Sequence, residues 1–278
     1  MSAVIPQVDP IRAKPIVAPK GSEKAAPLPP FVSDPTLPTH LDLPFEDGEI
    51  VENQFEYHQN RLLSDVLDPV LGALHPDGQF CNAADSGIYW RITNPPLKGC
   101  LAPDWFYIPN VPPSIVDGVC RRSYLIWQEH QRPLLVTEWV SGTGKEEHDR
   151  TPETGKFWVY ENGICAGFYV IFDHWHGKLE VFQRIDGKLQ PVVPNERGHY
   201  PIPPLGVELG IWRGTFVRVN GDWLRAWDLN GKLLPNKEEQ LAIGEQRTEQ
   251  EKQRAEQEKQ RAEKLAAQLR ALGLEPDA

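Results

Sequence analysis

One long helical pattern followed by a series of short apolar runs constrains the fold of this chain more than any other feature. The stretch "FEYHQNRLLSDVLDPVLGALH" (55–75) repeats apolar residues on the period of an α-helix. Strand-like runs follow at 87–93, 104–109, 133–140 and 167–173. A short helix is predicted before the last run. We therefore expect an α/β (α+β) domain with a mixed sheet, whose core follows the order helix, three strands, helix, strand.

Turn and cap signals predict where further elements begin and end. In "TPETGKFWVYENG" (151–163), Thr151 suits the N-cap, Pro152 the first helical position, and Gly163 the position just after the helix. Later in the chain, hairpin turns are predicted at three dipeptides: Asp186-Gly187, Asn220-Gly221 and Asn230-Gly231. These hairpins should extend or flank the sheet.

The composition changes twice along the chain. Residues 1–40 hold nine prolines, which predicts a mostly disordered Pro-rich arm. The aromatic residues gather in the predicted globular domain, 41–237. Residues 238–278 repeat "EQEKQRA" at a spacing of seven, which predicts a long charged helix. Only its last two turns have an apolar seam, so a weak coiled coil that forms a homo-oligomer and a solvated single helix both stay open.

Charge and hydropathy argue against some classes of protein. The net charge of −10 and pI of about 5.3 count against tight nonspecific coating of DNA, which needs a basic face. No apolar run approaches the roughly 20 residues that cross a bilayer. The amino terminus lacks the apolar stretch of a secretion signal, so we expect a cytoplasmic protein without a membrane partner. The cysteines form no C-x-x-C pair and are predicted to be free thiols: Cys81, Cys100, Cys120 and Cys165.

Two acids occupy comparable places at the ends of predicted strands. Asp104 opens the run "DWFYIP", and Glu138 closes the run "LLVTEW". If these strands pair antiparallel, the two carboxylates converge, and they repel each other unless a cation lies between them. Magnesium accepts such oxygen ligands, and Lys156 on the following helix would place an ammonium nearby. The alternatives are a local backbone contact for Asp104, a solvated strand end for Glu138 and a surface lysine.

Several longer motifs resemble the Uma-two family of putative endonucleases. They are "PDWFYIPNVP", "RRSYLIWQEHQRPLLVTEWVSGTG", "DRTPETGKFWVYENGICAGFYVIFD", "LEVFQRIDGKLQPV" and "ELGIWRGTFVRVNGDWLRAWDLNGKLLPNKEEQ". That family belongs to the restriction-endonuclease-like PD-(D/E)XK superfamily, and the resemblance covers roughly residues 42–240. It implies a restriction-endonuclease-like core that hydrolyses phosphodiester bonds in DNA with Mg²⁺ or Mn²⁺.

The resemblance implies roles for individual residues. Asp104 matches the aspartate of the Pro-Asp motif and Glu138 the glutamate of the second motif, both as catalytic and metal-binding acids. The superfamily usually carries a lysine two residues after that glutamate, where this chain has Val140. Lys156 matches a catalytic lysine that this family carries on the following helix.

Further residues match the family pattern less closely. Glu52 matches an additional metal-binding acid, and His58 falls where relatives often have histidine. The alternatives are a solvated acid and a histidine on the helix surface. Ser141 and Thr143 match a small polar run that could bond the phosphate or the acid, or form a turn.

Three other clusters have weaker signals. His174 and His176 in "DHWH" alternate as on a strand and could face one metal ion. Arg121 and Arg122 could contact a nucleic-acid backbone, although exposed loop arginines are equally consistent with the sequence. The segment "EEHDR" (146–150) is predicted to be a solvated loop.

Two hypotheses about function follow from these features. The first is a metal-dependent endonuclease that hydrolyses phosphodiester bonds in DNA. The second is a catalytically silent module that keeps the nuclease fold and meets partners through its helical tail.

Overall fold

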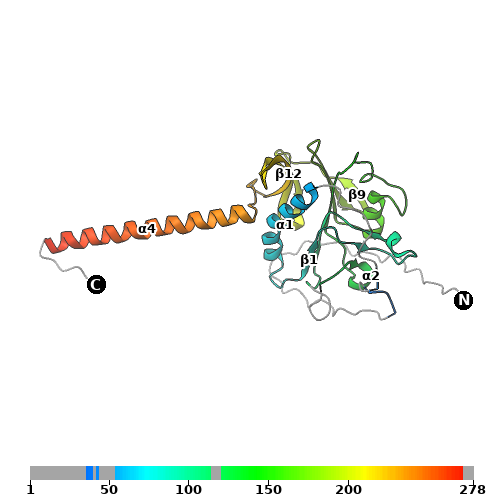
Figure 1. The fold of residues 1–278 in the computed structure, drawn as a ribbon, viewed down its shortest axis with the longest axis horizontal. Coiled ribbons are helices and arrows are strands. Elements are labelled where there is room, and N and C mark those ends of the chain that lie inside the picture. Colours follow the sequence, from blue (N-terminus) through cyan, green and yellow to red (C-terminus); the bar gives the residue numbers. More distant parts are fainter. Residues whose placement is uncertain (1–35, 40–41, 44–53, 114–119, 272–278) are drawn as a thin grey trace. The chain divides into compact units, whose positions relative to one another are not determined.

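The computed structural model describes residues 36–39, 42–43, 54–113 and 120–271 (Figure 1). The chain divides into two compact units, one ending at Leu234 and the other beginning at Pro235. The prediction of a disordered arm concerns residues that lie almost wholly outside the described ranges. Within the described ones, the carbonyl oxygen of Pro38 accepts a hydrogen bond from Trp127 Nε1 at 3.2 Å.

A six-stranded mixed sheet forms the centre of the first unit. Its strands follow the order β1-β4-β6-β7-β8-β9, with β6 and β7 parallel and the other neighbours antiparallel. The bounds are β1 Phe80–Ala83, β4 Trp105–Pro109, β6 Leu135–Trp139, β7 Phe168–Asp173, β8 Lys178–Ile185 and β9 Lys188–Pro191. The predicted α/β class is therefore confirmed, and the β8–β9 hairpin extends the sheet as expected.

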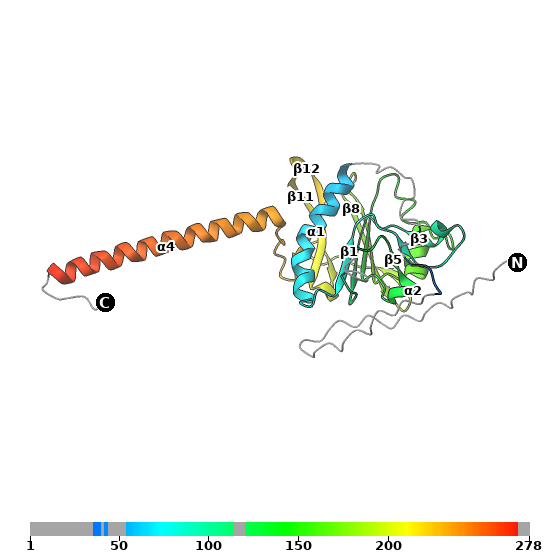
Figure 2. The same ribbon diagram turned by 60° about the horizontal axis from the view of Figure 1, so that its bottom comes forward.

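Helix α1 (Gln54–Leu74) covers part of the core, as its apolar period predicts. The indole Nε1 of Trp139 donates to Asn60 Oδ1 at 2.7 Å, and that of Trp105 donates to Ser64 Oγ at 2.9 Å, so α1 is bonded to residues of β6 and β4. The buried residues of the helix are Gln59, Asn60, Leu62, Leu63, Val66, Leu67 and Leu71. Figure 2 shows α1 running alongside strands β11 and β12 of the second sheet.

In that second sheet, one turn lies at residues other than those predicted. It contains β10 (Tyr200–Ile202), β11 (Val207–Phe216) and β12 (Val219–Asp228). The β11–β12 turn lies at Val217–Arg218, with φ of 45° and 69°, and not at Asn220-Gly221, which pairs inside the hairpin. A turn at Asn220-Gly221 would shift the register that places buried Trp223 opposite Trp212, so core packing overrides the local turn signal. The turns predicted at the other two dipeptides are confirmed.

The first predicted strand is also wrong. Only Ile88–Tyr89 (β2) of the run 87–93 forms a strand, in a small sheet with β3 (Cys100–Leu101) and β5 (Tyr124–Leu125). The edge of the main sheet is instead β1, whose four residues are all half-buried and lack apolar alternation. Pro95 and Pro96 cannot donate to a ladder and begin a short 3₁₀-helix, Pro96–Gly99. After β5 the chain forms the short helix α2 (Ile126–Glu129). A second 3₁₀-helix, Pro203–Leu205, lies between β10 and β11.

The helix before β7 begins and ends at residues other than those predicted. Helix α3 (Lys156–Trp158) continues into a π-helical segment, Val159–Ile164, and the N-cap is Gly155 rather than Thr151. The Thr151 hydroxyl donates to Asp149 Oδ1 at 2.6 Å instead of capping the helix. Gly163 lies inside the π-helical segment, whose C-cap is Cys165 with φ of 59°. A three-residue α-helix thus delivers Lys156 at its first position.

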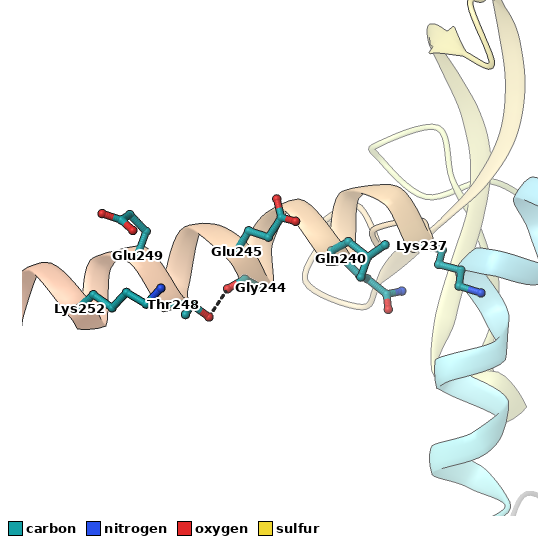
Figure 3. Close-up of a pocket in the computed structure, with 8 residues that line it drawn as sticks. Lys237, Gln240, Gly244, Glu245, Thr248, Glu249 and Lys252 are labelled. Carbon is teal, nitrogen blue, oxygen red and sulfur yellow. Dashed lines mark hydrogen bonds between the residues drawn. The ribbon is translucent and has the colours of Figure 1, made fainter.

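The second unit contains helix α4 (Lys237–Ala271), which confirms the predicted charged helix. Asn236 and Glu239 form a reciprocal capping box, with N···O distances of 2.8 and 2.9 Å. Figure 3 shows residues that line a pocket along this helix, among them Gly244 and Thr248, and Thr248 Oγ1 donates to the Gly244 carbonyl at 3.0 Å. Among the described helices, none is long and apolar enough to cross a membrane.

Candidate active site

The candidate site lies where β4 and β6 run side by side. These strands are antiparallel and Trp105 pairs with Thr137, which places Asp104 directly opposite Glu138. Asp104 Oδ2 accepts a hydrogen bond from the backbone N–H of Trp139 at 2.5 Å. Carboxyl groups opposite each other on an antiparallel pair lie close enough to interact. The predicted convergence of these two acids is thus present in the structure.

The environment of Asp104 disfavours its charged form. Burial and the nearby charge of Glu138 raise the pKa of Asp104 to about 9, although the bond from Trp139 N–H and the charge of Lys156 act in the other direction. Within the described residues, its second oxygen, Oδ1, accepts no hydrogen bond. A further positive charge near Asp104 would therefore be needed to stabilise its ionised form at neutral pH.

Buried Glu138 forms an ion pair with half-buried Lys156. Glu138 is only 1% exposed, and its Oε2 lies 2.8 Å from Lys156 Nζ. Its other oxygen, Oε1, accepts a hydrogen bond from the Tyr160 hydroxyl. Burial is the strongest single influence and acts to lower the pKa of Lys156. The charge and hydrogen bond of Glu138, together with the charges of Glu147 and Asp104, outweigh it and raise that pKa overall. The lysine is therefore charged, and its ammonium is fixed beside the carboxylate.

Two residues of this site carry no signal in the sequence. Glu147 belongs to "EEHDR", which we predict to be a solvated loop, yet it is only 3% exposed and its Oε1 lies 3.8 Å from Lys156 Nζ. The Tyr169 hydroxyl donates to the Glu147 carbonyl at 3.0 Å and fixes the loop over the lysine. Tyr160 reaches Glu138 because the π-helical segment turns it inward. Both contacts join residues that only the tertiary fold brings together, so the local sequence pattern does not predict them.

A third acid approaches Asp104 from α1. The charge of Glu56, in the first turn of that helix, contributes to raising the pKa of Asp104. Glu52, the predicted third metal-binding acid, lies outside the described residues. The helix start is nevertheless the element from which the family pattern expects an additional acid.

The donor set of the site fits a hard divalent cation. Magnesium is commonly held by one or two carboxylates together with water and substrate phosphates. Asp104 offers an oxygen without a donor among the described residues, and the pKa of its carboxyl is raised in the way that a missing positive charge would produce. No group of three or more His, Cys, Asp or Glu side chains is arranged to hold a metal within the described part of the chain. A cation here would therefore rest on Asp104 and Glu138.

Other predicted site residues lie elsewhere or have other partners. The ring of His58 packs against Tyr57, and its buried Nδ1 has no hydrogen-bond partner among the described residues. Ser141 and Thr143 are exposed in the turn after β6. Neither hydroxyl donates to Asp104 or Glu138 among the hydrogen bonds of the described residues.

Two further sequence hypotheses change in the structure. In "DHWH", Asp173 ends β7 and the next three residues form a turn rather than a strand, so His174 packs on Phe55 while His176 bonds Asp173. Arg121 forms an ion pair with Glu129 at 2.5 Å, and its side chain is only 7% exposed, so little of it is open to a nucleic acid. The four predicted free thiols are confirmed.

Comparison with known proteins gives a match to a family. The model of a family described as Uma2, putative restriction endonuclease, matches residues 36–220. Among solved structures, the chain is similar to a putative nuclease belonging to DUF820 from Anabaena variabilis ATCC 29413, with 12% sequence identity and a TM-score of 0.37 over 58% of this chain and 81% of that chain. No curated protein matches the chain. The matched range includes Asp104, Glu138 and Lys156.

Proposed function

The chain belongs to the Uma2 family of putative restriction endonucleases, and we propose that it is a metal-dependent nuclease that hydrolyses phosphodiester bonds in DNA. One observation supports this above the others. The ion pair between half-buried Lys156 and buried Glu138, at 2.8 Å, lies beside the carboxyl group of Asp104, whose ionisation burial and like charge disfavour. Such perturbed groups are typical of functional sites.

Asp104 and Glu138 would hold the divalent cation. When bound, the cation lowers the pKa of a water molecule and offsets charge on a phosphoryl oxygen. The protein's own contribution is to present the two carboxyl groups from paired strands, so that their separation is set by the β4–β6 ladder. The Trp139 N–H orients Asp104, and the Tyr160 hydroxyl orients Glu138.

Lys156 would stabilise negative charge that develops on the scissile phosphate. The position two residues after Glu138 holds Val140, which is buried in the apolar core, so an ammonium cannot come from there. Helix α3 instead brings Lys156 Nζ to the Glu138 carboxylate. A pre-oriented cation costs no reorganisation during the reaction, which is the main source of electrostatic catalysis.

The test is cleavage of supercoiled, linear duplex and single-stranded DNA, and of RNA, with Mg²⁺ or Mn²⁺. We expect wild type to cleave DNA, and Asp104→Asn, Glu138→Gln and Lys156→Met each to lose on the order of 100-fold or more in rate. Matched controls are Glu208→Gln, a buried acid paired with Arg197, and Lys188→Met, which removes a lysine paired with Glu161. Both controls should keep wild-type activity.

Three outcomes would contradict the proposal. Equal cleavage by wild type and Asp104→Asn would identify a contaminating nuclease. Cleavage of RNA alone would correct the substrate. Absence of cleavage with every substrate and metal, in a folded protein, would favour the catalytically silent module.

A further inference from the structure

Glu147 is a buried acid that the proposed chemistry does not use. Its side chain is only 4% exposed, and its Oε1 lies 3.8 Å from Lys156 Nζ. Within the described residues, this ammonium is the cation that lies within 4 Å of the carboxylate, and neither carboxylate oxygen accepts a hydrogen bond. A buried carboxylate is costly unless it is paired. Glu147 is therefore placed for an interaction that the present arrangement makes only in part.

The loop that carries Glu147 is fixed to two strands of the main sheet. The Tyr169 hydroxyl, from β7, donates to the Glu147 carbonyl at 3.0 Å. His148 Nε2 lies 3.0 Å from Glu180 Oε2 on β8, and its Nδ1 lies 2.5 Å from the Gly144 carbonyl oxygen within the loop. These bonds hold the backbone at Glu147 and next to it, so its carboxylate has a set position before metal or substrate binds.

Both oxygens of Glu138 are already engaged. Oε2 lies 2.8 Å from Lys156 Nζ, and Oε1 accepts a hydrogen bond from the Tyr160 hydroxyl. A magnesium ion lies about 2.1 Å from a carboxylate oxygen. On Glu138 it would meet the positive charge of Lys156 at close range, and the two cations would repel each other. Lys156 therefore opposes metal binding for as long as its ammonium stays on Glu138.

Glu147 offers Lys156 a second acceptor. Burial raises the pKa of Glu138, and the charge of Glu147 adds to this effect, so the two carboxylates interact, with the ammonium within 4 Å of both. A shift of Nζ by about 1 Å would shorten the 3.8 Å separation to the length of a charge-assisted hydrogen bond. The flexible stem of a lysine allows such a shift without movement of the helix backbone.

We propose that Glu147 is a positioning residue that accepts Lys156 from Glu138 when a divalent cation binds. Glu138 then keeps the Tyr160 hydroxyl on Oε1, and its Oε2 is open to the cation. Lys156 stays charged beside Glu147, from where it can face the scissile phosphate. The exchange is complete before the chemical step, so the ammonium is again fixed during the reaction. This inference rests on the proposed function, since it takes Asp104 and Glu138 to hold a metal.

The test measures metal binding without DNA. Full-length protein is titrated with Mg²⁺ and with Mn²⁺ in a calorimeter. Glu147→Gln keeps the shape of the side chain but offers Lys156 no charge, so the ammonium stays on Glu138 and metal affinity should fall about tenfold. Lys156→Met removes the competing ammonium and should bind metal at least as tightly as wild type does.

The double variant decides whether Glu147 acts through Lys156. In the Lys156→Met background, the loss of metal affinity caused by Glu147→Gln should shrink to less than about threefold. A role of Glu147 in folding alone would not depend on the lysine in this way. Glu146→Gln removes the neighbouring acid of the same loop, which is exposed, and should bind metal as wild type does.

The outcomes separate this inference from the proposed function. Equal metal affinity of wild type and Glu147→Gln would overturn the inference, whether or not wild type cleaves DNA. An undiminished tenfold loss in the Lys156→Met background would also overturn it, because Glu147 would then act on the metal directly. Absence of metal binding by folded wild type would contradict both. If circular dichroism shows Glu147→Gln to be unfolded, Glu147→Asp, whose shorter side chain lies farther from Lys156, replaces it in the same comparison.

Discussion

At the scale of single residues, the proton on Asp104 can be measured without any substrate. The pKa of this carboxyl is raised from 3.8 to about 9 in the native protein, so between these values the native state holds a proton that the unfolded state has released. Stability should therefore fall as pH rises through this window, by up to about 1.4 kcal/mol per pH unit. Asp104→Asn should remove that slope in denaturation experiments with EDTA at pH 6 to pH 9.

Glu208→Gln is the matched control for this experiment. Burial acts to raise the pKa of Glu208, but hydrogen bonds from Arg197 and His199 lower it overall. The stability that Glu208 contributes is present above its unfolded pKa and is lost only as pH falls through the lower native value. The slope between pH 6 and pH 9 should thus be unchanged in Glu208→Gln. If Asp104→Asn shows the same dependence of stability on pH as wild type, the Asp104 carboxyl of wild type does not have the raised pKa.

The Tyr160 hydroxyl should contribute to stability as well as to the orientation of Glu138. Tyr160→Phe leaves Glu138 Oε1 buried without its donor, which should cost about 1–3 kcal/mol. Tyr200→Phe removes a hydroxyl that donates to the Leu179 carbonyl at 2.9 Å from a half-buried position, and should cost no more than about 1 kcal/mol. Urea denaturation of both variants gives the comparison. Equal losses would mean that Glu138 finds another donor.

At the scale of elements, the position of Lys156 depends on the close approach of Gly155 to the loop before it. A Cβ at Gly155 would lie 2.4 Å from the carbonyl oxygen of Asp149, although φ of −72° suits any residue. Gly155→Ala should therefore push α3 away from the loop and cost about 1–3 kcal/mol. Lys156 would move with the helix, so DNA cleavage should fall as well. Gly142→Ala, where a Cβ meets no atom within 4 Å, should change neither stability nor cleavage.

The β11–β12 turn offers a stabilising change. Val217 and Arg218 both have positive φ, which side chains of L-residues adopt with strain. Replacing them by Asn and Gly, the preferred pair for such a turn, should raise the free energy of unfolding by about 1 kcal/mol. Thermal denaturation of the double variant measures this gain. A loss of stability would show that Val217, which packs against the core, contributes more than the strain costs.

The same elements show which parts of the fold a sequence can predict. Helix α1 repeats its apolar period over 21 residues, and β4, β6 and β7 are short runs rich in aliphatic and aromatic residues, so local pattern is sufficient there. Strand β1 is a four-residue edge strand without alternation, and it exists only because β4 offers it a partner. Asp104 and Glu138 could be found because the ends of these two strands are visible in the sequence, and Lys156 because its segment resembles the family pattern. Glu147 reaches the site because its loop packs against the domain, and Tyr160 because a π-helical segment turns it inward. Both features result from tertiary packing and not from a local sequence pattern.

At the scale of the whole molecule, the two units differ in what stabilises them. The unit ending at Leu234 has its own hydrophobic core, whereas the described residues of α4 from Leu241 on are exposed almost throughout. Helical stability in such a segment comes from the cap at Asn236 and from pairs such as Gln253 with Glu249, each worth a few tenths of a kcal/mol. A chain ending at Asn236 should therefore keep the thermal midpoint and the cleavage activity of the full chain within error.

Self-association through α4 should be weak and confined to its last turns. In the heptad register Ala255 and Ala262 alternate with Glu251 and Glu258, so an apolar seam begins only at Leu265, which is 57% exposed. We expect sedimentation velocity to show monomers at low concentration and a partial shift to dimers at high concentration. Leu265→Gln and the chain ending at Asn236 should abolish that shift, while Leu241→Gln, at the opposite end of the helix, should not. A dimer that persists after truncation would place the interface in the first unit.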